Sequence, residues 1–320
     1  MPTRKSPRKG SLQFWPRKRA KKFLPRVNWN AISDSGKILK GFICYKAGMR
    51  SVLVKDMTLN SMTKDKTKTI PATILECPAM KIFSVRFYKQ GKPAKDILAE
   101  NLDKELKRKL KLPKAKKKFA LDEKHDYDDV KLIFYSVVKK TNLKKKPDLI
   151  EIGLDNKLNF EDKLNFVKEN LNKEFSVCDF FWENELVDFR GLTRGKGLQG
   201  PVKRFGITLK VHKSEKGRRR PGSIGPWHPA RVTFRVPMAG QLGMFTRAIY
   251  NNKIISLGKI SDSDKLKLKN IKNYGDIKTD FVIVAGSVQG PSKRQLVMTK
   301  PLRETKKQKK KNYELLEVLR

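Results

Sequence analysis

The sequence has 320 residues and is strongly basic, with 74 Lys and Arg residues against 32 Asp and Glu and a formal net charge of +42. A free protein with this charge repels itself, so we expect a polyanionic partner, and nucleic acid is the commonest one. Three scattered cysteines without a CxxC pair argue against a disulfide framework and a zinc site. The basic start lacks an apolar signal segment, and no apolar run reaches the roughly 18 residues that cross a bilayer. These features predict a soluble, intracellular protein without membrane contact.

Residues 1–35 are predicted to form a basic N-terminal arm. Its first 26 residues hold ten Lys and Arg residues and no acid, and four prolines prevent a long helix. Aromatic residues, among them Trp15 and Trp29, are interleaved with this charge. Such a segment has little apolar surface to bury on its own, so we expect it to become ordered against an anion.

Short apolar runs follow, and we interpret them as strands. The expected strands are 41–45, 51–54, 80–88, 207–211, 253–257 and 281–285. They fall into three parts of the chain, 36–94, 188–211 and 248–302. Consecutive short strands with Gly and Pro turns favour a barrel, so these three parts are predicted to close into one sheet.

Residues 95–187 have a different periodicity and are predicted to form an α+β insertion. Apolar residues recur at helical spacing over 97–110 and over 158–171, and the apolar run 130–138 indicates a strand. The stretch 119–189 holds 16 acids against 11 lysines. This excess of acid predicts that the insertion faces solvent or protein.

Residues 190–247 are rich in glycine and nearly free of acid. They contain ten of the 20 glycines, five prolines, 14 Lys and Arg residues, and one acid, Glu215. An ordered loop of this composition loses much conformational entropy and buries little surface in return. Against RNA, glycine lets the backbone approach phosphates and bases, while Arg and Lys neutralise the charge. We therefore predict a central RNA-penetrating extension over 212–247; the alternative is a floppy surface loop. Residues 303–320 are predicted to form a basic C-terminal tail.

Motifs typical of enzymes are present only in incomplete form. Gly195–Gly200 matches G-x-G-x-x-G, but Pro201 follows at once, no amphipathic helix is expected there, and Arg218–Arg220 stand where a dinucleotide site has an acid. The acidic stretch 121–129 around His125 lacks the glycine and closing glutamate of a calcium loop, which favours a solvated turn. His212 and His228 have no neighbouring nucleophile or paired carboxylate. We therefore expect no catalytic residues, no metal ligands and no cofactor.

A basic run that leads into a tryptophan is the remaining candidate site. Arg218–Arg220 precede Trp227, which stands between Pro226 and Pro229 with no acid nearby apart from Glu215. An indole can stack on an unpaired base, and the prolines limit the entropy lost on docking. The alternative is a tryptophan that fills a local core.

At these residues the chain resembles the universal large-subunit ribosomal protein L-three family, in its archaeal or eukaryotic form. The family signature matches Phe181, Asp188, Gly191, Thr193, Gly195, Lys196, Gly197, Gly200 and Arg204. Further similar segments are 8–12, 15–20, 41–49, 225–232 and 238–241. The resemblance covers nearly the whole chain and is weakest in the insertion.

The resemblance implies a mainly β fold, with a six-stranded translation-protein-type barrel and an α+β insertion. The arm and the central loop would run into large-subunit rRNA toward the peptidyl transferase centre, with Trp227 at the tip of the loop and Arg219 near its base. Ribosomal neighbours would be proteins L-fourteen and L-twenty-four-e, and tRNA and translation factors would be affected indirectly. Any Mg²⁺ and K⁺ would belong to the rRNA, and the protein would act in the cytoplasmic ribosome.

The residues predicted to bind rRNA share a cationic, aromatic or amide side chain near these motifs. They are Arg8, Lys9, Trp15, Arg17, Lys18, Arg19, Arg194, Lys196, Lys203, Arg204, Arg218, Arg219, Arg220, Trp227, His228, Arg231, Arg235 and Gln241. The glycines predicted to let the backbone approach RNA are Gly195, Gly197, Gly200, Gly222, Gly225 and Gly240. The alternative functions are a free RNA chaperone or RNA-modifying factor, for which we find no cofactor loop or catalytic pair, and a DNA-packaging protein.

Overall fold

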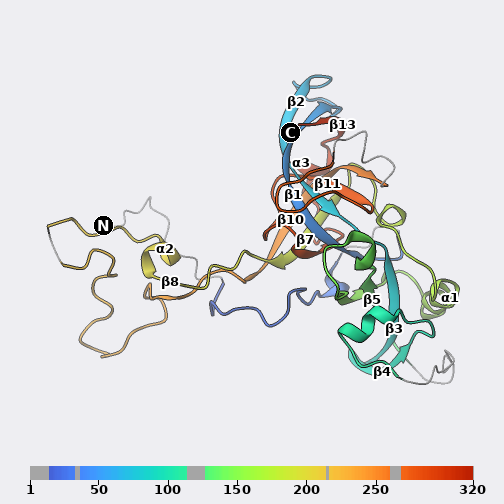
Figure 1. Ribbon diagram of the computed structural model, residues 1–320, viewed down its shortest axis with the longest axis horizontal. Helices are drawn as coiled ribbons and strands as arrows, with labels where there is room; N and C mark the ends of the chain where they lie inside the picture. Colours follow the sequence, from blue (N-terminus) through green and yellow to red (C-terminus); the bar gives the residue numbers. More distant parts are fainter. Residues whose placement is uncertain (1–13, 33–36, 114–126, 214–215, 260–267, 320) are drawn as a thin grey trace. The chain divides into compact units, whose positions relative to one another are not determined.

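The computed structural model is mainly β and divides into two compact units (Figure 1). The described residues are 14–32, 37–113, 127–213, 216–259 and 268–319. Unit 1 comprises Met1–Phe23 and Leu192–Arg247, and unit 2 comprises Leu24–Gly191 and Ala248–Arg320. The predicted contacts Arg8 and Lys9 and the acidic turn around His125 therefore lie outside the described residues.

The larger sheet has seven strands, in the order β12-β7-β10-β11-β2-β1-β13, and β1 also pairs with β12. The hydrogen-bonded order of the first six strands therefore returns to its start, while β13 lies beside β1. The strands are β1 (Gly41–Asp56), β2 (Thr67–Glu76), β7 (Leu186–Leu192), β10 (Thr246–Gly258), β11 (Phe281–Ala285), β12 (Gln295–Thr299) and β13 (Tyr313–Val318). β1 pairs antiparallel with β12, with Gly41 opposite Thr299, and β11 pairs antiparallel with β2, with Phe281 opposite Glu76.

A second sheet of unit 2 has four strands, in the order β4-β3-β5-β6. Its strands are β3 (Met80–Lys89), β4 (Lys92–Leu98), β5 (Asp129–Ser136) and β6 (Leu149–Gly153). Helical segments of unit 2 are α1 (Phe160–Asn170), α3 (Lys306–Lys309), η1 (Trp29–Ala31), η2 (Lys104–Arg108), η3 (Val138–Thr141) and η4 (Val177–Asp179). One buried apolar cluster continues from the larger sheet, at Phe42 and Val282, into the smaller one, at Phe134.

Trp29 shows how two glycines make room for this core. The indole is 3% exposed and belongs to the apolar cluster. A Cβ on Gly41 would lie 2.7 Å from its Cη2, and a Cβ on Gly153 would lie 2.5 Å from its Cβ. Contacts that short cannot be accommodated in a close-packed interior, so both strands depend on glycine at the point where Trp29 packs. The predicted arm 1–35 is wrong at this end, because Trp29 is a core residue of unit 2.

Several predicted elements are confirmed. The runs 41–45 and 51–54 lie in one long strand, β1, and the run 281–285 is β11. The run 253–257 lies within β10 and is buried over Lys253–Ile255. In the insertion, the predicted strand 130–138 corresponds to β5 and the predicted helix 158–171 to α1.

The start of the insertion differs from the prediction. The expected helix over 97–110 is wrong, because Ile97 and Leu98 end strand β4 and only the short η2 follows. The run 80–88 is a strand as predicted, but β3 pairs with β4 and β5 of the smaller sheet. The expected boundary at residue 94 therefore falls within a strand of that sheet. The helical spacing of apolar residues wrongly indicated a helix here, because residues 92–98 pair with β3, for example Ile97 with Val85.

Two more predictions are corrected. The expected strand 207–211 is absent, and Leu209 and Val211 are 41% and 73% exposed. The run does not pair with the two-stranded sheet that the structure describes in unit 1, so its β propensity does not produce a strand. The predicted C-terminal tail 303–320 contains β13, which pairs with β1 from Val52 to Asp56.

Candidate nucleic-acid interface

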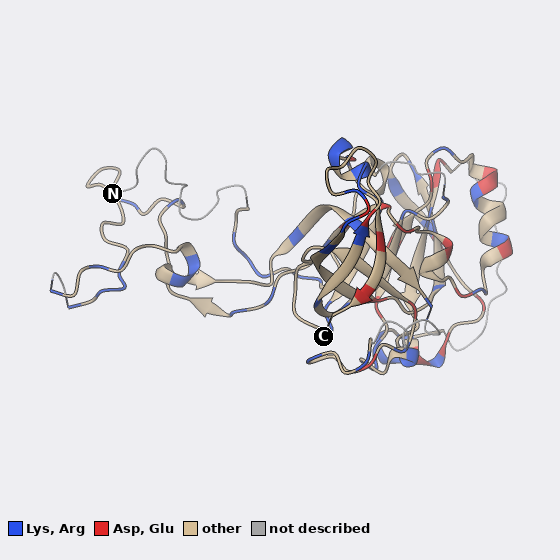
Figure 2. Ribbon diagram, turned by 90° about the horizontal axis from the view of Figure 1, so that it is seen from above, with Lys and Arg blue, Asp and Glu red and all other residues tan. Residues whose placement is uncertain are grey.

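The two units differ in charge. Every charged side chain among the described residues of unit 1 is Lys or Arg, whereas unit 2 carries both signs (Figure 2). Close like charges raise the energy of the free protein, and an oppositely charged partner would lower it. A phosphate backbone supplies that charge along an extended path. Unit 1 is therefore the candidate interface.

Unit 1 is built on a two-strand ladder that joins distant parts of the sequence. Leu198 and Gln199 of β8 (Leu198–Gln199) pair with Gln241 and Gly240 of β9 (Gly240–Gln241). The Lys196 N–H also donates to the Leu242 carbonyl at 3.0 Å. This ladder holds the Gly-basic-Gly segment against the end of the central extension.

Gly243 makes this approach possible. Its φ is +80°, and a Cβ there would lie 1.9 Å from the Arg194 carbonyl oxygen. Only glycine fits this position, for both conformational and steric reasons. Gly197 also has a positive φ, +63°, but no neighbouring atom lies within 4 Å of its Cβ position. The space beside Gly197 is open, as a backbone that contacts a ligand requires.

Arg204 and Arg17 organise the protein as well as contributing charge. Arg204 Nη1 donates to the Met238 carbonyl at 2.8 Å, and its Nε donates to the Gln241 carbonyl at 3.0 Å. Burial lowers the pKa of the Arg204 guanidinium. Arg17 donates to the Arg204 carbonyl at 3.2 Å and lies 4.2 Å from the centre of the Phe205 ring. These contacts tie the arm, the short helix α2 (Pro201–Phe205) and the central extension together.

Trp15 belongs to an aromatic cluster of unit 1. Its ring centroid lies 6.4 Å from that of Phe205 and 5.7 Å from that of Phe234. Trp15 was predicted as a site residue from the sequence, but Phe205 and Phe234 were not. Both are flanked by arginines, in Arg204-Phe205 and Phe234-Arg235, and this pairing was the available signal. Because Trp15 packs in this cluster, its exposed surface for a base is smaller than that of Trp227.

Trp227 is 88% exposed. Its ring meets His228 edge-on, with centroids 6.5 Å apart. The alternative that this indole fills a local core is therefore wrong. Gly225 allows the tight course of this segment, because a Cβ there would lie 3.1 Å from the Arg231 carbonyl oxygen. An exposed indole carried by such a loop is suited to stacking on an unpaired base.

A hollow of about 390 Å³ adjoins the arginine run. Its lining combines apolar side chains with two guanidinium groups: Pro201, Arg219, Arg220, Pro221, Gly222, Ile224, Pro237, Met238 and Ala239. Apolar walls with a few polar groups are typical of sites that take a small planar group.

The predicted residues divide by exposure. The exposed ones are Lys18, Arg19, Arg194, Lys196, Lys203, Arg218, Arg219, Arg220, Trp227, His228, Arg231 and Arg235, together with Gly195, Gly197, Gly200, Gly222 and Gly225. The half-buried ones are Trp15, Arg17, Arg204, Gln241 and Gly240. Arg218 also donates to the Lys210 carbonyl at 3.1 Å.

The dinucleotide-type motif needs one correction. A helix does begin at Pro201, with Gly200 as its N-cap, although none was expected. It has five residues, and the arginines that follow leave no carboxylate for a ribose. Among the described residues no group of three or more potential metal ligands occurs, and no helix there is long and apolar enough to cross a membrane.

Other signature positions have structural reasons. The buried Asp188 carboxylate accepts the Asn251 N–H at 2.8 Å and the Leu302 N–H at 2.9 Å. Burial raises the pKa of Asp188, and these two donors oppose the rise. A Cβ on Gly191 would lie 2.3 Å from Leu296 Cδ2. These positions hold unit 2 together rather than present a surface.

The family model and the relatives that match this chain belong to one protein family. The family model described as Ribosomal protein L3 matches residues 1–129 and 120–318. Relatives named large ribosomal subunit protein uL3 include one from Methanocaldococcus jannaschii, 39% identical over 93% of this chain and 91% of its own length. Those from Methanococcus aeolicus and Archaeoglobus fulgidus are 40% and 39% identical over 94% of this chain and 92% and 93% of their own lengths.

Proposed function

We propose that unit 1 of this chain, which belongs to the ribosomal protein L3 family in its archaeal and eukaryotic form, is its rRNA-binding part. The chain is a structural rather than enzymatic constituent of the large ribosomal subunit. The observation that carries this proposal is the absence of Asp and Glu from the described residues of unit 1, together with the exposed indole of Trp227. The protein acts in translation, within the ribonucleoprotein of the cytoplasmic ribosome.

The cations of unit 1 fit a sequence-independent contact with the rRNA backbone. Arg218, Arg219 and Arg220 are consecutive and exposed, and each can neutralise a phosphate and release its counterions. RNA helices packed around them would lose part of their mutual repulsion. The exposed glycines Gly195, Gly197 and Gly200 leave room for the backbone to come within contact of a phosphate or sugar.

Trp227 fits a role at the tip of the extension. An indole that is 88% exposed has apolar surface that a partner can cover. In the proposed arrangement it stacks on an rRNA base near the peptidyl transferase centre and influences tRNA and factor binding through the shape of the RNA. The nearby hollow beside Arg219 and Ile224 offers a second surface for RNA. The chemistry of peptide transfer remains with the RNA.

Unit 2 supplies the support for this extension. The six strands whose pairing order returns to its start fit a translation-protein-type barrel. We expect the barrel to dock against the subunit surface and against ribosomal proteins, with proteins L-fourteen and L-twenty-four-e as the proposed neighbours. No cofactor is required for this role, and Mg²⁺ and K⁺ would be held by the rRNA.

A charge-neutralising variant tests the role of the arginine run. In Arg218→Gln/Arg219→Gln/Arg220→Gln we expect impaired incorporation into large subunits, because three phosphate contacts are lost together. Sedimentation of extracts that express the tagged variant measures the fraction of the chain in the large-subunit peak. The control, Lys306→Gln/Lys307→Gln/Lys310→Gln, removes the same charge from exposed positions of unit 2. Equal incorporation of the two variants would refute the proposed role.

A second variant tests the tip. In Trp227→Ala we expect near-normal assembly but altered binding of tRNA or translation factors, because the support is intact and the stacking group is gone. The measurement is tRNA and factor affinity of purified subunits, with Trp182→Ala as a control at a tryptophan of unit 2 that is 52% exposed. Unchanged affinities and unchanged drug response in Trp227→Ala would contradict the proposal.

A further inference from the structure

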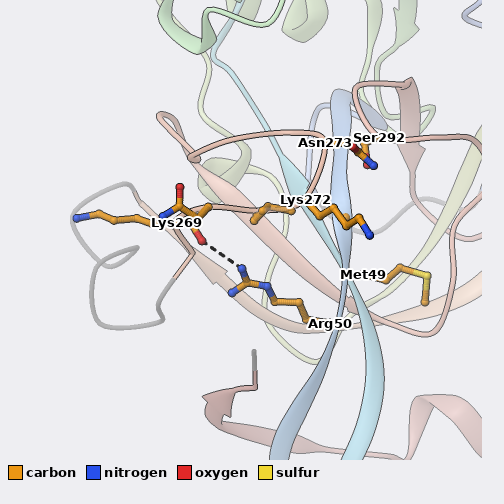
Figure 3. A pocket seen from close by; sticks show the side chains of 9 residues that line it. Met49, Arg50, Lys269, Lys272, Asn273 and Ser292 are labelled. Carbon is orange, nitrogen blue, oxygen red and sulfur yellow. Dashed lines mark hydrogen bonds between the residues drawn. The ribbon is translucent and has the colours of Figure 1, made fainter.

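A second hollow, of about 550 Å³, lies in unit 2 against the middle of β1 (Figure 3). Its lining residues come from β1, from the segment 269–273 and from one turn: Gly48, Met49, Arg50, Lys269, Asn270, Ile271, Lys272, Asn273 and Ser292. These residues are separate from the arginine run and from Trp227, and the function proposed above does not use them.

The wall formed by 268–277 has a fixed backbone. Leu268, Ile271, Tyr274 and Ile277 are buried in the same apolar cluster as strands of the larger sheet. The Ile271 N–H donates to the Gly275 carbonyl at 2.9 Å. Because every third residue of this segment is buried, the side chains between them, including Lys272, face solvent. The loop therefore presents its polar groups from a preorganised support.

Two features of β1 bring this wall close to the strand. A Cβ on Gly48 would lie 2.8 Å from Ile271 Cγ2, so the loop packs where the strand has no side chain. The half-buried Arg50 donates from Nη2 to the Lys269 carbonyl at 3.1 Å, drawn as a dashed line in Figure 3. This bond holds one guanidinium nitrogen at the edge of the hollow.

The lining has the chemistry of a nucleotide site. It combines the cations Arg50, Lys269 and Lys272 with the amides Asn270 and Asn273 and the hydroxyl of Ser292, and none of the described residues that line it is a carboxylate. Cations bind a phosphate, and amide and hydroxyl groups can pair with a ribose hydroxyl or a base edge.

Met49, 46% exposed, adds a polarisable apolar surface on which a base can lie. The volume is within the usual range, roughly 300–1,000 Å³, for sites that enclose a small ligand. An acidic peptide would use the cations but would have less need of the amides and the thioether. RNA is therefore the favoured occupant.

We propose that this hollow of unit 2 is a second RNA-binding site, which holds one nucleotide of large-subunit rRNA with its phosphate against Lys272. The inference rests on the proposed rRNA-binding function and extends it to the unit that carries charges of both signs. It gives the protein two separate contacts with RNA, one on each unit. A protein with two contacts can link two RNA segments during assembly.

The test places a photoactivatable probe at the hollow in assembled subunits. Lys272→Cys is modified with an azidophenacyl reagent, incorporated into large subunits and irradiated. The expected product is an adduct that ribonuclease shortens and that maps to one stretch of rRNA. The wild-type chain, treated in the same way, is the background control, because Cys44 and Cys77 are buried and Cys178 is half-buried. An adduct with protein alone, or none above background, overturns the inference.

A parallel probe keeps this outcome distinct from that of the proposed function. Trp227→Cys, labelled in the same way, reports on the tip of the extension. RNA adducts at both positions, at different rRNA stretches, support both proposals. An RNA adduct at 227 with none at 272 overturns only the second site, and the reverse overturns only the proposed tip contact. Absence of RNA adducts at both positions overturns both.

Discussion

The two units of this protein handle charge in different ways. In unit 2, carboxylates pair with some of the cations, as where Lys163 lies 2.7 Å from Asp129 and Arg86 lies 2.9 Å from Glu151. In the described part of unit 1 no carboxylate is present, and the ordered cations bind carbonyls and aromatic rings, as Arg204 does. Unit 2 also has a large apolar core. The described part of unit 1 has no carboxylate to balance its cations, so an anionic partner would stabilise it more.

The same contrast applies to tryptophan. Trp29 in unit 2 is 3% exposed and Trp227 in unit 1 is 88% exposed. A tryptophan in a close-packed core contributes to folding, while an exposed one is available to a partner. We therefore expect a substitution at Trp29 to change mainly the free energy of unfolding, and a substitution at Trp227 to change mainly the binding of a partner.

The largest expected effect is that of Trp29→Ala. Loss of a buried indole removes apolar contacts and leaves a cavity beside Gly41 and Gly153, so we expect a loss of about 3–5 kcal/mol in the free energy of unfolding. Urea denaturation of the full chain, followed by circular dichroism, measures this loss. A loss below about 1 kcal/mol, within the range of surface substitutions, would show that the core does not depend on this residue.

The next largest effect that we expect is on the pH dependence of the stability of unit 2. Burial alone would raise the pKa of Asp56, but hydrogen bonds from Lys68, Thr58 and Thr63 outweigh it and hold this pKa well below the usual value. A carboxyl group whose pKa is lower in the folded state contributes stability above its unfolded pKa, about 4. That contribution is lost as the pH falls through the folded pKa. We therefore expect wild-type stability to fall below about pH 4, and less steeply in Asp56→Asn.

Denaturation curves at several pH values measure this difference. Asp65→Asn is the matched control, because Asp65 lies in the same β1–β2 connection, pairs with Lys55 at 3.5 Å and has a side chain that is 56% exposed. Such a surface pair contributes little. Parallel acid branches for wild type and Asp56→Asn would contradict the assigned role of Asp56.

Elements with a regular burial pattern could be predicted from the sequence. Elements whose conformation depends on pairing with strands far away in the sequence could not. β11 is a continuous buried run, and the amphipathic α1 has helical spacing, so both could be recognised locally. β2 alternates over its first half and contains Pro71, which weakens a strand prediction. Its pairing with β1 and β11 overrides that local signal.

The candidate site follows the same rule. Exposed cations and Trp227 could be predicted from composition, because a glycine-rich segment with a single acid has little to bury. The scaffold role of Arg204 could not, since its acceptors Met238 and Gln241 lie 34 and 37 positions along the chain. The hollow beside β1 was also missed. Its lysines lie more than 200 residues from Arg50, and only the fold brings them together.

The smallest expected effect is that of Trp227→Ala on the stability of the isolated chain. An indole that is 88% exposed has few contacts to lose, so we expect a change within about 0.5 kcal/mol in the same urea denaturation. Amide exchange of residues 216–235 should be fast in RNA-free buffer for both wild type and variant, because few backbone hydrogen bonds protect this segment. Slow exchange there, or a destabilisation like that of Trp29→Ala, would mean that unit 1 has a fold of its own. Trp227 would then be a core residue like Trp29, and not an exposed group available to RNA.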